Sequence, residues 1–484
     1  MLTFPGFVGP SYVSQNLRAA DQVCMNWYVE QLEVPNEPFG SMLYPTPGCA
    51  TLVSAENDES PVRGLTEQKG RCFTVIGEKF YEIDSDFALI GSGYGTVVRD
   101  ANPASFAGID LTGSQLFFVS GDKGYLYALG GTSITQVISS GATQGAFLDG
   151  FFLALDGTTS TLKVSALNDG TTWEASQIAQ RTAGSDPWKA LVVVHRDIWL
   201  FGEKTSEVWY NAGTSPFPFG AIPGAFLEQG IVAPFSAKAI GNTVMWLGSS
   251  DDGVGVVYRA DGYNGQRVST HAVEFAIQGY TRKGLSISDA VAFTYQEDGH
   301  IFYVLNFPEA NATWVYDMAT QLWHERGTWD VNKTIFTAWR PQYHAYFNKK
   351  HIVGDRSLGT LYDMSVDKFT DAGGGPLRRV RRTPHLNIDN DYVVYDEFQV
   401  ELQTGLGLSA GQGSDPQAML RWSDDGGETW GNEHWVSAGA RGNYGTRAIW
   451  RRLGRGYDRV FELAVSDPVP WRLMGAYIGA RRQQ

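Results

Sequence analysis

A short unit repeats along most of this chain: an apolar strand, a tight polar turn, a second apolar strand and a longer link. The turns begin at Gly77, Gly113, Asp149, His195, Gly241, Asp298 and Asn348. Successive turns are therefore 36, 36, 46, 46, 57 and 50 residues apart. These intervals bracket the roughly 40–50 residues that one four-stranded blade of a β-propeller contains.

The residues after the turns are continuous apolar runs, for example residues 116–119 and 301–305. Strands that are buried on both faces, as in stacked blades, have this composition. A second strand follows in most units, and residues 314–323 (WVYDMATQLW) resemble a kelch-type strand–turn–strand. The sequence therefore predicts an irregular β-propeller of six to seven blades over residues 61–370.

Composition indicates an all-β protein with more than one domain. The 484 residues exceed the roughly 250–300 beyond which a single hydrophobic core stops growing. Glycine occurs 56 times and aromatic residues make up 13% of the chain, which is typical of strands and turns. The best helical candidate is the short segment 21–31.

The sequence gives little indication of a cofactor site or of a membrane-spanning segment. The cysteines Cys24, Cys49 and Cys72 are not in metal-ligand spacing, and buried, reduced thiols are the expected state. The longest apolar run is shorter than the about 18 residues that a membrane helix needs. We expect no metal, no cofactor and no membrane insertion.

The repeat leaves three other parts of the chain to be interpreted. Residues 1–60 do not fit it and are predicted to form an extended arm or a closing segment. Residues 371–377, rich in glycine and ending with proline and leucine, predict a flexible linker. Alternating strands follow over 378–484, which suits a small antiparallel β-sandwich-like domain.

One local pattern in the C-terminal part matches the S-x-D-x-G-x-T-W "Asp box" of sialidases and other β-proteins. Its members are Ser423, Asp425, Gly427 and Trp430, and a poorer copy lies at 168–173. In such a hairpin the aspartate accepts backbone N–H bonds, the glycine adopts positive φ and the tryptophan packs beneath the turn. An Asp box stabilises a fold and does not catalyse.

Charge is distributed unevenly between the two parts of the chain. The net charge of −14 argues against a protein that grips duplex DNA. From Gly373 onward there are 14 arginines, 13 acidic residues and no lysine. Arginine suits fixed ion pairs at interfaces better than lysine does, although GC-rich codon usage would produce the same bias.

Two basic stretches are candidates for a partner interface. They comprise Arg378, Arg379, Arg381 and Arg382, and then Arg451, Arg452 and Arg455. The first stretch suits an acidic protein partner or a nucleic-acid backbone. It also suits an edge strand kept soluble by charge, or one paired to the acidic propeller.

Three segments at the two ends resemble the packaged-DNA stabilisation, or tail hub, proteins of short-tailed bacteriophages. They are residues 9–12 with 26–30, residues 44–48, and the C-terminal stretch 449–455 with 461–465 and 468–475. The middle of the chain is similar to this family in layout only.

The resemblance implies a structural virion protein and no enzyme. Such a protein is expected to be made in the host bacterial cytoplasm and to enter the tail below the portal and its adaptor. It would form a ring, commonly a homohexamer, that extends the DNA channel and helps to retain packaged DNA. Partners would be the head-to-tail adaptor and tail fibre, spike or needle proteins, and genomic DNA would pass through the lumen without specific binding. Acidic residues of the first 372 could line that lumen.

Two other classes of protein stay open at this point. A glycosidase or sialidase-like enzyme would need two carboxylates about 5–10 Å apart. Glu397 with Glu401 and Asp424 with Asp425 are the paired carboxylates in the C-terminal part. A carbohydrate-binding propeller module is the second alternative.

Overall fold

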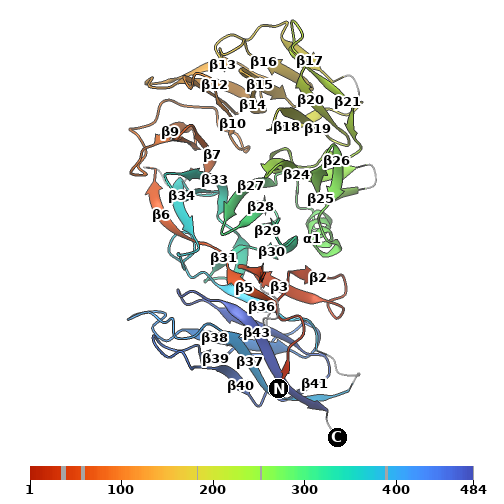
Figure 1. Cartoon of the computed structure of the whole chain (residues 1–484), viewed down its shortest axis with the longest axis vertical. Helices are drawn as coiled ribbons and strands as arrows, with labels where there is room; N and C mark the ends of the chain where they lie inside the picture. The colour runs from red at the N-terminus through yellow and green to blue at the C-terminus, as the bar shows by residue number, and fades with distance from the viewer. Residues whose placement is uncertain (34–39, 56–59, 182–183, 251–252, 387–390, 483–484) are drawn as a thin grey trace.

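The computed structural model of the chain describes residues 1–33, 40–55, 60–181, 184–250, 253–386 and 391–482. Almost every regular element in these residues is a β-strand, and most strands pair with a neighbour in sequence (Figure 1). Seven successive groups of strands form the blades of a propeller, and the strands beyond them form a sandwich. The all-β expectation and the prediction of six to seven blades are confirmed.

The first four blades are simple meanders. The first contains β7 (Val62–Gln68), β8 (Arg71–Ile76) and β9 (Lys79–Ile83). The second contains β10 (Ser105–Ile109), β11 (Gln115–Ser120), β12 (Lys123–Ala128) and β13 (Ile134–Ile138). The third contains β14 (Gln144–Leu148), β15 (Phe151–Asp156), β16 (Thr161–Val164) and β17 (Ile178–Gln180). The fourth contains β18 (Trp188–Val194), β19 (Asp197–Gly202), β20 (Ser206–Asn211) and β21 (Phe219–Leu227).

The last three blades carry additions. The fifth contains β22 (Gly230–Ile231), β23 (Lys238–Ile240), β24 (Thr243–Ser250), β25 (Gly253–Asp261) and β26 (Asn264–Arg267), with a 3-10 turn η1 (Pro234–Ser236). The sixth contains β27 (Val291–Glu297), β28 (His300–Phe307), β29 (Ala312–Asp317) and β30 (Leu322–Glu325). A hairpin of β31 (Gly327–Asp330) and β32 (Ile335–Ala338) follows. The seventh contains β33 (Pro341–Phe347), β34 (Lys350–Asp355), β35 (Thr360–Ser365) and β6 (Gly48–Ser54).

The innermost strands of the blades form a closed ring. Each of β7, β10, β14, β18, β23 and β27 contacts the innermost strand of the next blade, and β33 contacts β7. The last blade is completed by a strand from the N-terminal segment, because β6 pairs with β35 at the outer side of the blade over six residues. The two ends of the propeller sequence are thereby held together by backbone hydrogen bonds.

Six of the seven predicted turns join the first and second strands of a blade. The exception is Gly77, which joins the second and third strands, β8 and β9. The first hairpin of that blade turns instead at Lys69 and Gly70, both with positive φ. All seven predicted turn residues have φ between 45° and 73°, the left-handed region that tight hairpin turns require.

The sandwich is built from two sheets that draw on both ends of the chain. One sheet contains β1 (Leu2–Thr3), β4 (Trp27–Gln31), β5 (Ser41–Pro45), β37 (Val393–Leu402), β40 (Ala448–Arg451), β41 (Arg455–Gly456) and β43 (Leu473–Arg482). The other contains β2 (Tyr12–Val13), β3 (Asp21–Met25), β36 (Arg379–Arg382), β38 (Gln417–Ser423), β39 (His434–Ser437) and β42 (Val460–Val465). The predicted arm over residues 1–60 is thus divided between the sandwich and the seventh blade.

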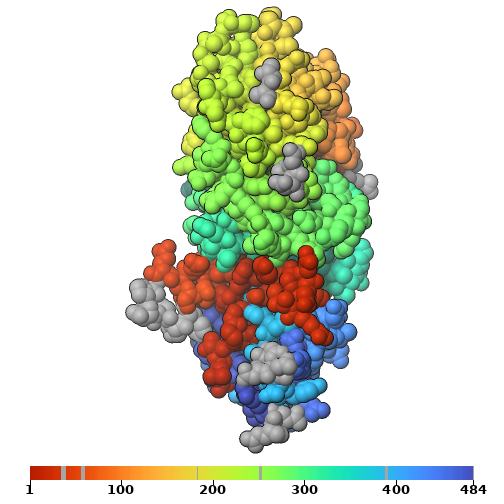
Figure 2. Space-filling view, turned by 90° about the vertical axis from the view of Figure 1, so that its right-hand side faces the viewer, coloured from red at the N-terminus to blue at the C-terminus, as the bar shows by residue number. Residues whose placement is uncertain are grey.

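The N-terminal strands join the two domains. Figure 2 shows them as a band between the propeller and the C-terminal residues. Strand β3 pairs with β30 of the sixth blade and with β36, so that one sheet runs from the propeller into the sandwich. His300 of the sixth blade donates hydrogen bonds of 2.7 Å to Glu30 of β4 and to Asp317. Although burial lowers its pKa, these two carboxylates raise the pKa of His300 to about 9.

The predicted flexible linker is a packed turn. The Asp371 amide donates a hydrogen bond of 2.9 Å to the Gly375 carbonyl, and the Gly374 amide donates to the Asp371 carbonyl at 2.9 Å. Asp371, Ala372 and Leu377 are buried. Burial raises the pKa of Asp371 to about 6. The glycines of this segment therefore form a compact connection between the two domains.

The helical expectation for residues 21–31 is wrong, because these residues form β3 and β4. The α-helix in the described part of the chain is α1 (His271–Arg282), which precedes the sixth blade. Its N-cap Thr270 accepts a bond from the Val273 amide, and Glu274 in the first turn is bound by Arg267 at 2.6 Å. Val273 and Ile277 pack into the core between the fifth and sixth blades. The helix is only about three turns long, so its apolar periodicity is too short to distinguish it in the sequence from the surrounding strands.

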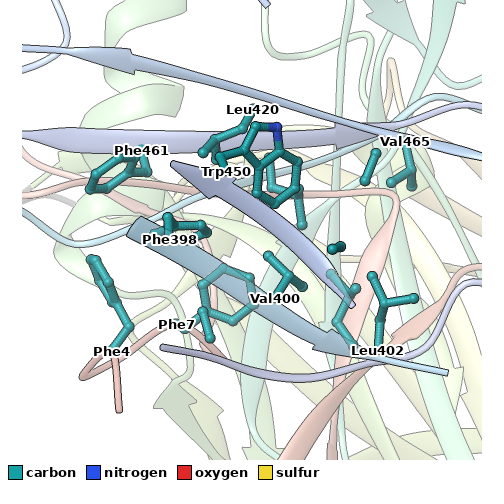
Figure 3. Packing of buried hydrophobic residues seen from close by; sticks show 14 of the residues in the cluster. Phe4, Phe7, Phe398, Val400, Leu402, Leu420, Trp450, Phe461 and Val465 are labelled. Atoms are coloured by element: carbon teal, nitrogen blue, oxygen red, sulfur yellow. The ribbon is translucent and has the colours of Figure 1, made fainter. Parts of the chain in front are cut away.

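The sandwich core contains residues from both ends of the chain (Figure 3). Phe4 and Phe7 come from the N-terminal residues, and both contact Phe398 of β37. Phe398 stacks on Phe461 of β42 with ring centroids 4.7 Å apart. The first residues of the chain are therefore part of the core between the two sheets.

Candidate assembly interface

The Asp-box residues form a tight turn after β38. Asp425 accepts hydrogen bonds from the Ser423 hydroxyl at 2.6 Å and the Thr429 amide at 2.9 Å. Gly427 has φ 100° and donates to the Ser423 hydroxyl at 2.8 Å. The hydrogen bonds from Ser423 and Thr429 lower the pKa of Asp425 to about 2. The Trp430 indole N–H donates to the Gly427 carbonyl at 3.0 Å, which fixes the ring against the turn.

The structure brings this turn onto the arginine-rich strand. The Arg382 guanidinium lies 4.6 Å from the centre of the Trp430 ring, and that of Arg421 lies 5.1 Å from it. Both arginines bind Glu462 of β42, and Arg382 also binds Asp21 of β3 at 2.8 Å. A row of alternating charges therefore crosses four strands and is covered by the Asp-box tryptophan.

An apolar row runs beside the charged one. Its members face each other across five neighbouring strands: Met25, Val380, Ala464, Met419 and Trp435. The first four are buried, whereas 60% of Trp435 is exposed. Trp435 lies on β39, the last strand of this sheet. A large aromatic side chain therefore projects from the edge of an otherwise buried apolar stripe.

A groove of about 490 Å³ separates these rows from the β31–β32 hairpin. Arg378 lies at this groove, where it binds Glu433 and lies 4.7 Å from the centre of the Trp329 ring of the hairpin. Phe336 of the hairpin packs on the apolar row, and Ile335 near the hairpin tip is 48% exposed. We call this surface, from Trp435 through the groove to Ile335, the tryptophan–arginine groove.

The other two arginines of the same strand point to the opposite face, because side chains alternate along a strand. Arg379 and Arg381 are buried completely. Arg381 donates to the carbonyls of Phe7 at 2.6 Å and Gly6 at 2.9 Å. Burial lowers the pKa of Arg379 to about 9 and that of Arg381 to about 10. Arg379 donates to the carbonyls of Leu377 and Thr46 at 3.4 Å. Arg381 thus holds the N-terminal residues in place, and neither arginine presents a surface to a partner.

The second basic stretch lies on the other sheet and does not join the groove. Arg451 is paired with Glu397 at 3.8 Å, and its side chain is 67% exposed. The Arg452 amide donates to the Asp396 carbonyl at 2.8 Å. The Arg455 guanidinium lies 5.6 Å from the centre of the Tyr392 ring, a residue that is 58% exposed. This part of the sandwich is a second surface of arginine and tyrosine.

The carboxylate pair of the Asp box serves structure. Asp424 is bound by Arg459 at 2.7 Å, and Asp425 is held within the turn. An acid catalyst for glycoside hydrolysis needs a raised pKa, whereas the pKa of Asp425 is lowered. The poorer copy of the motif shares the tryptophan bond, since Trp173 donates to Gly170 at 2.8 Å, but its Asp169 accepts from the Thr171 amide two residues on, at 2.9 Å.

Sequence reasoning missed Trp435, Trp329, Asp21 and Glu462. The signal that identifies them is cross-strand register, because Arg382, Glu462 and Arg421 face one another only once three distant strands are paired. Within the ranges that the structure describes, no helix is long and apolar enough to cross a membrane. The same residues hold no group of three or more His, Cys, Asp or Glu side chains suited to a metal ion.

The chain is distantly similar to several solved structures. The WD40 domain of Neurospora crassa Pan2 is 11% identical with a TM-score of 0.41, and the match covers 66% of this chain and 94% of that one. The N-terminal domain of Nup159 is 11% identical with a TM-score of 0.38 (72% and 99% covered). PorZ of the Porphyromonas gingivalis type-IX secretion system is 12% identical with a TM-score of 0.37 (72% and 44% covered). No curated protein sequence matches significantly.

Two family models match nearly the whole chain. Residues 11–368 match the β-propeller of bacteriophage P22 Gp10, and residues 378–481 match its β-sandwich. The two matches follow the two parts of the structure, with the packed turn at 371–377 between them. The resemblance of the chain ends to phage tail hub proteins is thereby confirmed. The chain belongs to the family of bacteriophage P22 Gp10 and is a structural protein of a phage tail hub.

Proposed function

We propose that this protein works as a ring of identical subunits, a homohexamer, below the portal and its adaptor. The ring extends the DNA channel and helps to retain packaged DNA in the virion. The observation that carries this proposal is the tryptophan–arginine groove with the exposed Trp435 at its edge. Protein interfaces are enriched in tryptophan and arginine and depleted of lysine, and this domain contains 14 arginines and no lysine.

The groove suits contact with a second copy of the chain. Its charges are already paired within the subunit, so that burial against a neighbour does not leave a charge without a partner. Trp435 and Ile335 supply apolar area on its two sides. A neighbouring subunit that covers both would remove this apolar surface from water, which favours association.

The second surface, with Arg451, Arg452 and Arg455, is our candidate for the adaptor or for tail fibre, spike or needle proteins. Arg451 and Tyr392 are exposed there, and guanidinium groups bind carboxylates of a partner in a fixed geometry. Assembly takes place in the host bacterial cytoplasm, and the protein does not insert into a membrane. We assign 61–370 to the propeller and 378–484 to the C-terminal β domain, each of which is completed by strands from residues 1–60.

DNA passes through the lumen of the ring without specific binding. The net charge of −15 over the first 372 residues supports this proposal, because like charges on the lumen wall repel the DNA backbone. A strongly positive lumen in the assembled ring would contradict it.

The role we propose is assembly and not catalysis. The lowered pKa of Asp425 and the ion pair of Asp424 support this view against a sialidase-like enzyme. Incubation with a fluorogenic sialoside and with plant glycans should give no hydrolysis above the buffer control. Release of sugar at a rate abolished by Asp424→Asn would favour the enzyme.

The ring is tested by the mass of the purified protein in solution, measured by light scattering over a concentration series. The wild-type chain should form one closed oligomer of six subunits, or should do so once the adaptor is added. Trp435→Ala should shift the equilibrium to monomers by about tenfold or more in dissociation constant. The matched control is Tyr210→Ala, which removes a 43% exposed aromatic residue of the fourth blade. Equal assembly of the Trp435→Ala and wild-type proteins would overturn the groove as the subunit contact.

A further inference from the structure

Two cavities lie one after the other along the propeller axis. The inner one, about 480 Å³, is lined by residues of all seven innermost strands. The outer one, about 810 Å³, lies at the mouth where several of these strands begin. Phe235, next to Pro234 in η1, and Tyr343 line both cavities. The two cavities therefore meet at these aromatic side chains.

Two charged side chains at the mouth make only part of their hydrogen bonds. Asp289 accepts from the Glu309 amide at 2.8 Å through Oδ2, while its buried Oδ1 has no partner among the described residues. Arg356 donates to Asn311 at 3.1 Å through Nη2, while its buried Nε has no acceptor in the same part of the chain. Both residues line the mouth cavity. Burial raises the pKa of Asp289 and lowers that of Arg356, as expected for charges that are incompletely compensated.

The remaining charges at the mouth leave an excess of positive charge. Arg63 is paired with Asp100, and Lys189 is paired with Glu203 at 3.0 Å. Arg99 also lines the mouth, is exposed, and makes no ion pair to any residue that the structure describes. Arg99 and Arg356 together outweigh Asp289, although the chain as a whole carries a net charge of −14.

We propose that the mouth of the propeller binds an extended acidic peptide segment of another protein. The guanidinium group of Arg356, whose charge is only partly compensated within the chain, would bind one carboxylate of that segment. An acidic side chain of the same segment would bind Arg99, and Phe235 would contact its apolar atoms. The termini of this chain lie at the far end of the sandwich (Figure 1), so the segment comes from another molecule. This site goes beyond the subunit contact proposed above and does not depend on it.

The test measures the anisotropy of fluorescein-labelled hexaglutamate titrated with the full-length protein. Hexaglutamate should bind at least about tenfold more tightly than labelled hexaglutamine, because one charge-assisted hydrogen bond accounts for that ratio. Arg356→Gln should weaken binding about tenfold. Asp289→Asn removes a negative charge from the mouth and keeps the side-chain volume, so its affinity should equal or exceed that of the wild type.

The matched control is Arg196→Gln, because Arg196 is exposed and lies on the opposite end of the innermost strand β18. Its affinity for hexaglutamate should be unchanged. Absence of binding, equal binding of hexaglutamine, or the same loss in Arg196→Gln would overturn the site. Displacement by maltohexaose would assign the mouth to a glycan instead. If Arg356→Gln abolished self-association, the segment would belong to a second copy, and the assignment to another protein would be overturned.

Discussion

The propeller and the sandwich are assembled in opposite ways. In each of the first six blades the strands come from one continuous stretch of 22 to 40 residues, and apart from β22, which pairs with β24, they pair in sequence order. In the sandwich, β37 pairs with β43 some 80 residues later, and β3 pairs with β36 more than 350 residues later. The propeller is therefore specified locally, whereas the sandwich depends on contacts between the two ends of the chain.

The strongest test of this contrast removes an N-terminal contact of the sandwich. Phe4→Ala should lower the free energy of unfolding by about 3–4 kcal/mol, because a buried phenylalanine is replaced by a cavity between Phe398 and Phe461. Chemical denaturation monitored by circular dichroism measures the change. The control Phe226→Ala removes an exposed ring of the fourth blade and should have little effect. Equal losses for both variants would break the contrast.

Arg381 of β36 tests the same dependence of the sandwich on the N-terminal residues through its buried hydrogen bonds. Arg381→Met should cost about 2–3 kcal/mol, because the carbonyls of Gly6 and Phe7 lose their donor while the apolar volume is kept. Hydrogen exchange should show faster exchange in residues 4–13 and unchanged exchange in β10–β13. Uniform acceleration across the propeller would contradict the local role of this arginine.

The link between β4 and the sixth blade should depend on pH. The pKa of His300 in the folded protein is raised to about 9, so its ion pairs stabilise the fold fully below pH 6.5. That stabilisation should fall, by about 2 kcal/mol in total, as the pH rises through 9. Denaturation of the wild type and of His300→Gln at pH 6, 8 and 10 measures it. If the stability of His300→Gln decreased with pH as steeply as that of the wild type, a group other than His300 would be responsible.

The smallest effect is expected at the Asp-box turn. Gly427→Ala should cost about 1–3 kcal/mol, because φ is 100° and the added Cβ meets the Asp21 carboxylate that binds Arg382. Gly411→Ala, with φ 77° and open space around it, isolates the backbone part of that cost. Thermal melts of both proteins would show the difference. A smaller loss at Gly427 than at Gly411 would mean that the turn does not support the arginine row.

The same contrast explains which features can be predicted from the sequence. The hairpin turns at Asp149 and Asn348 follow from local patterns of polar and apolar residues, and the Asp box from a short motif. The turn predicted at Gly77 is present between β8 and β9, but the sequence alone does not show that it is the second hairpin of its blade, because successive hairpins have similar local patterns. The position of Trp435 beside Met419 and Ala464, and the opposite orientation of Arg381 and Arg382, depend on pairing between distant strands. Such pairing is set by the closure of the whole core.

Electron cryo-microscopy of the assembled ring tests most directly whether the tryptophan–arginine groove is the contact between subunits. We predict that Trp435, 60% exposed in the single chain, is buried against a neighbouring copy, together with the tip of the β31–β32 hairpin. A ring in which Trp435 and the groove face solvent, with the subunits joined through other surfaces, would contradict the proposal.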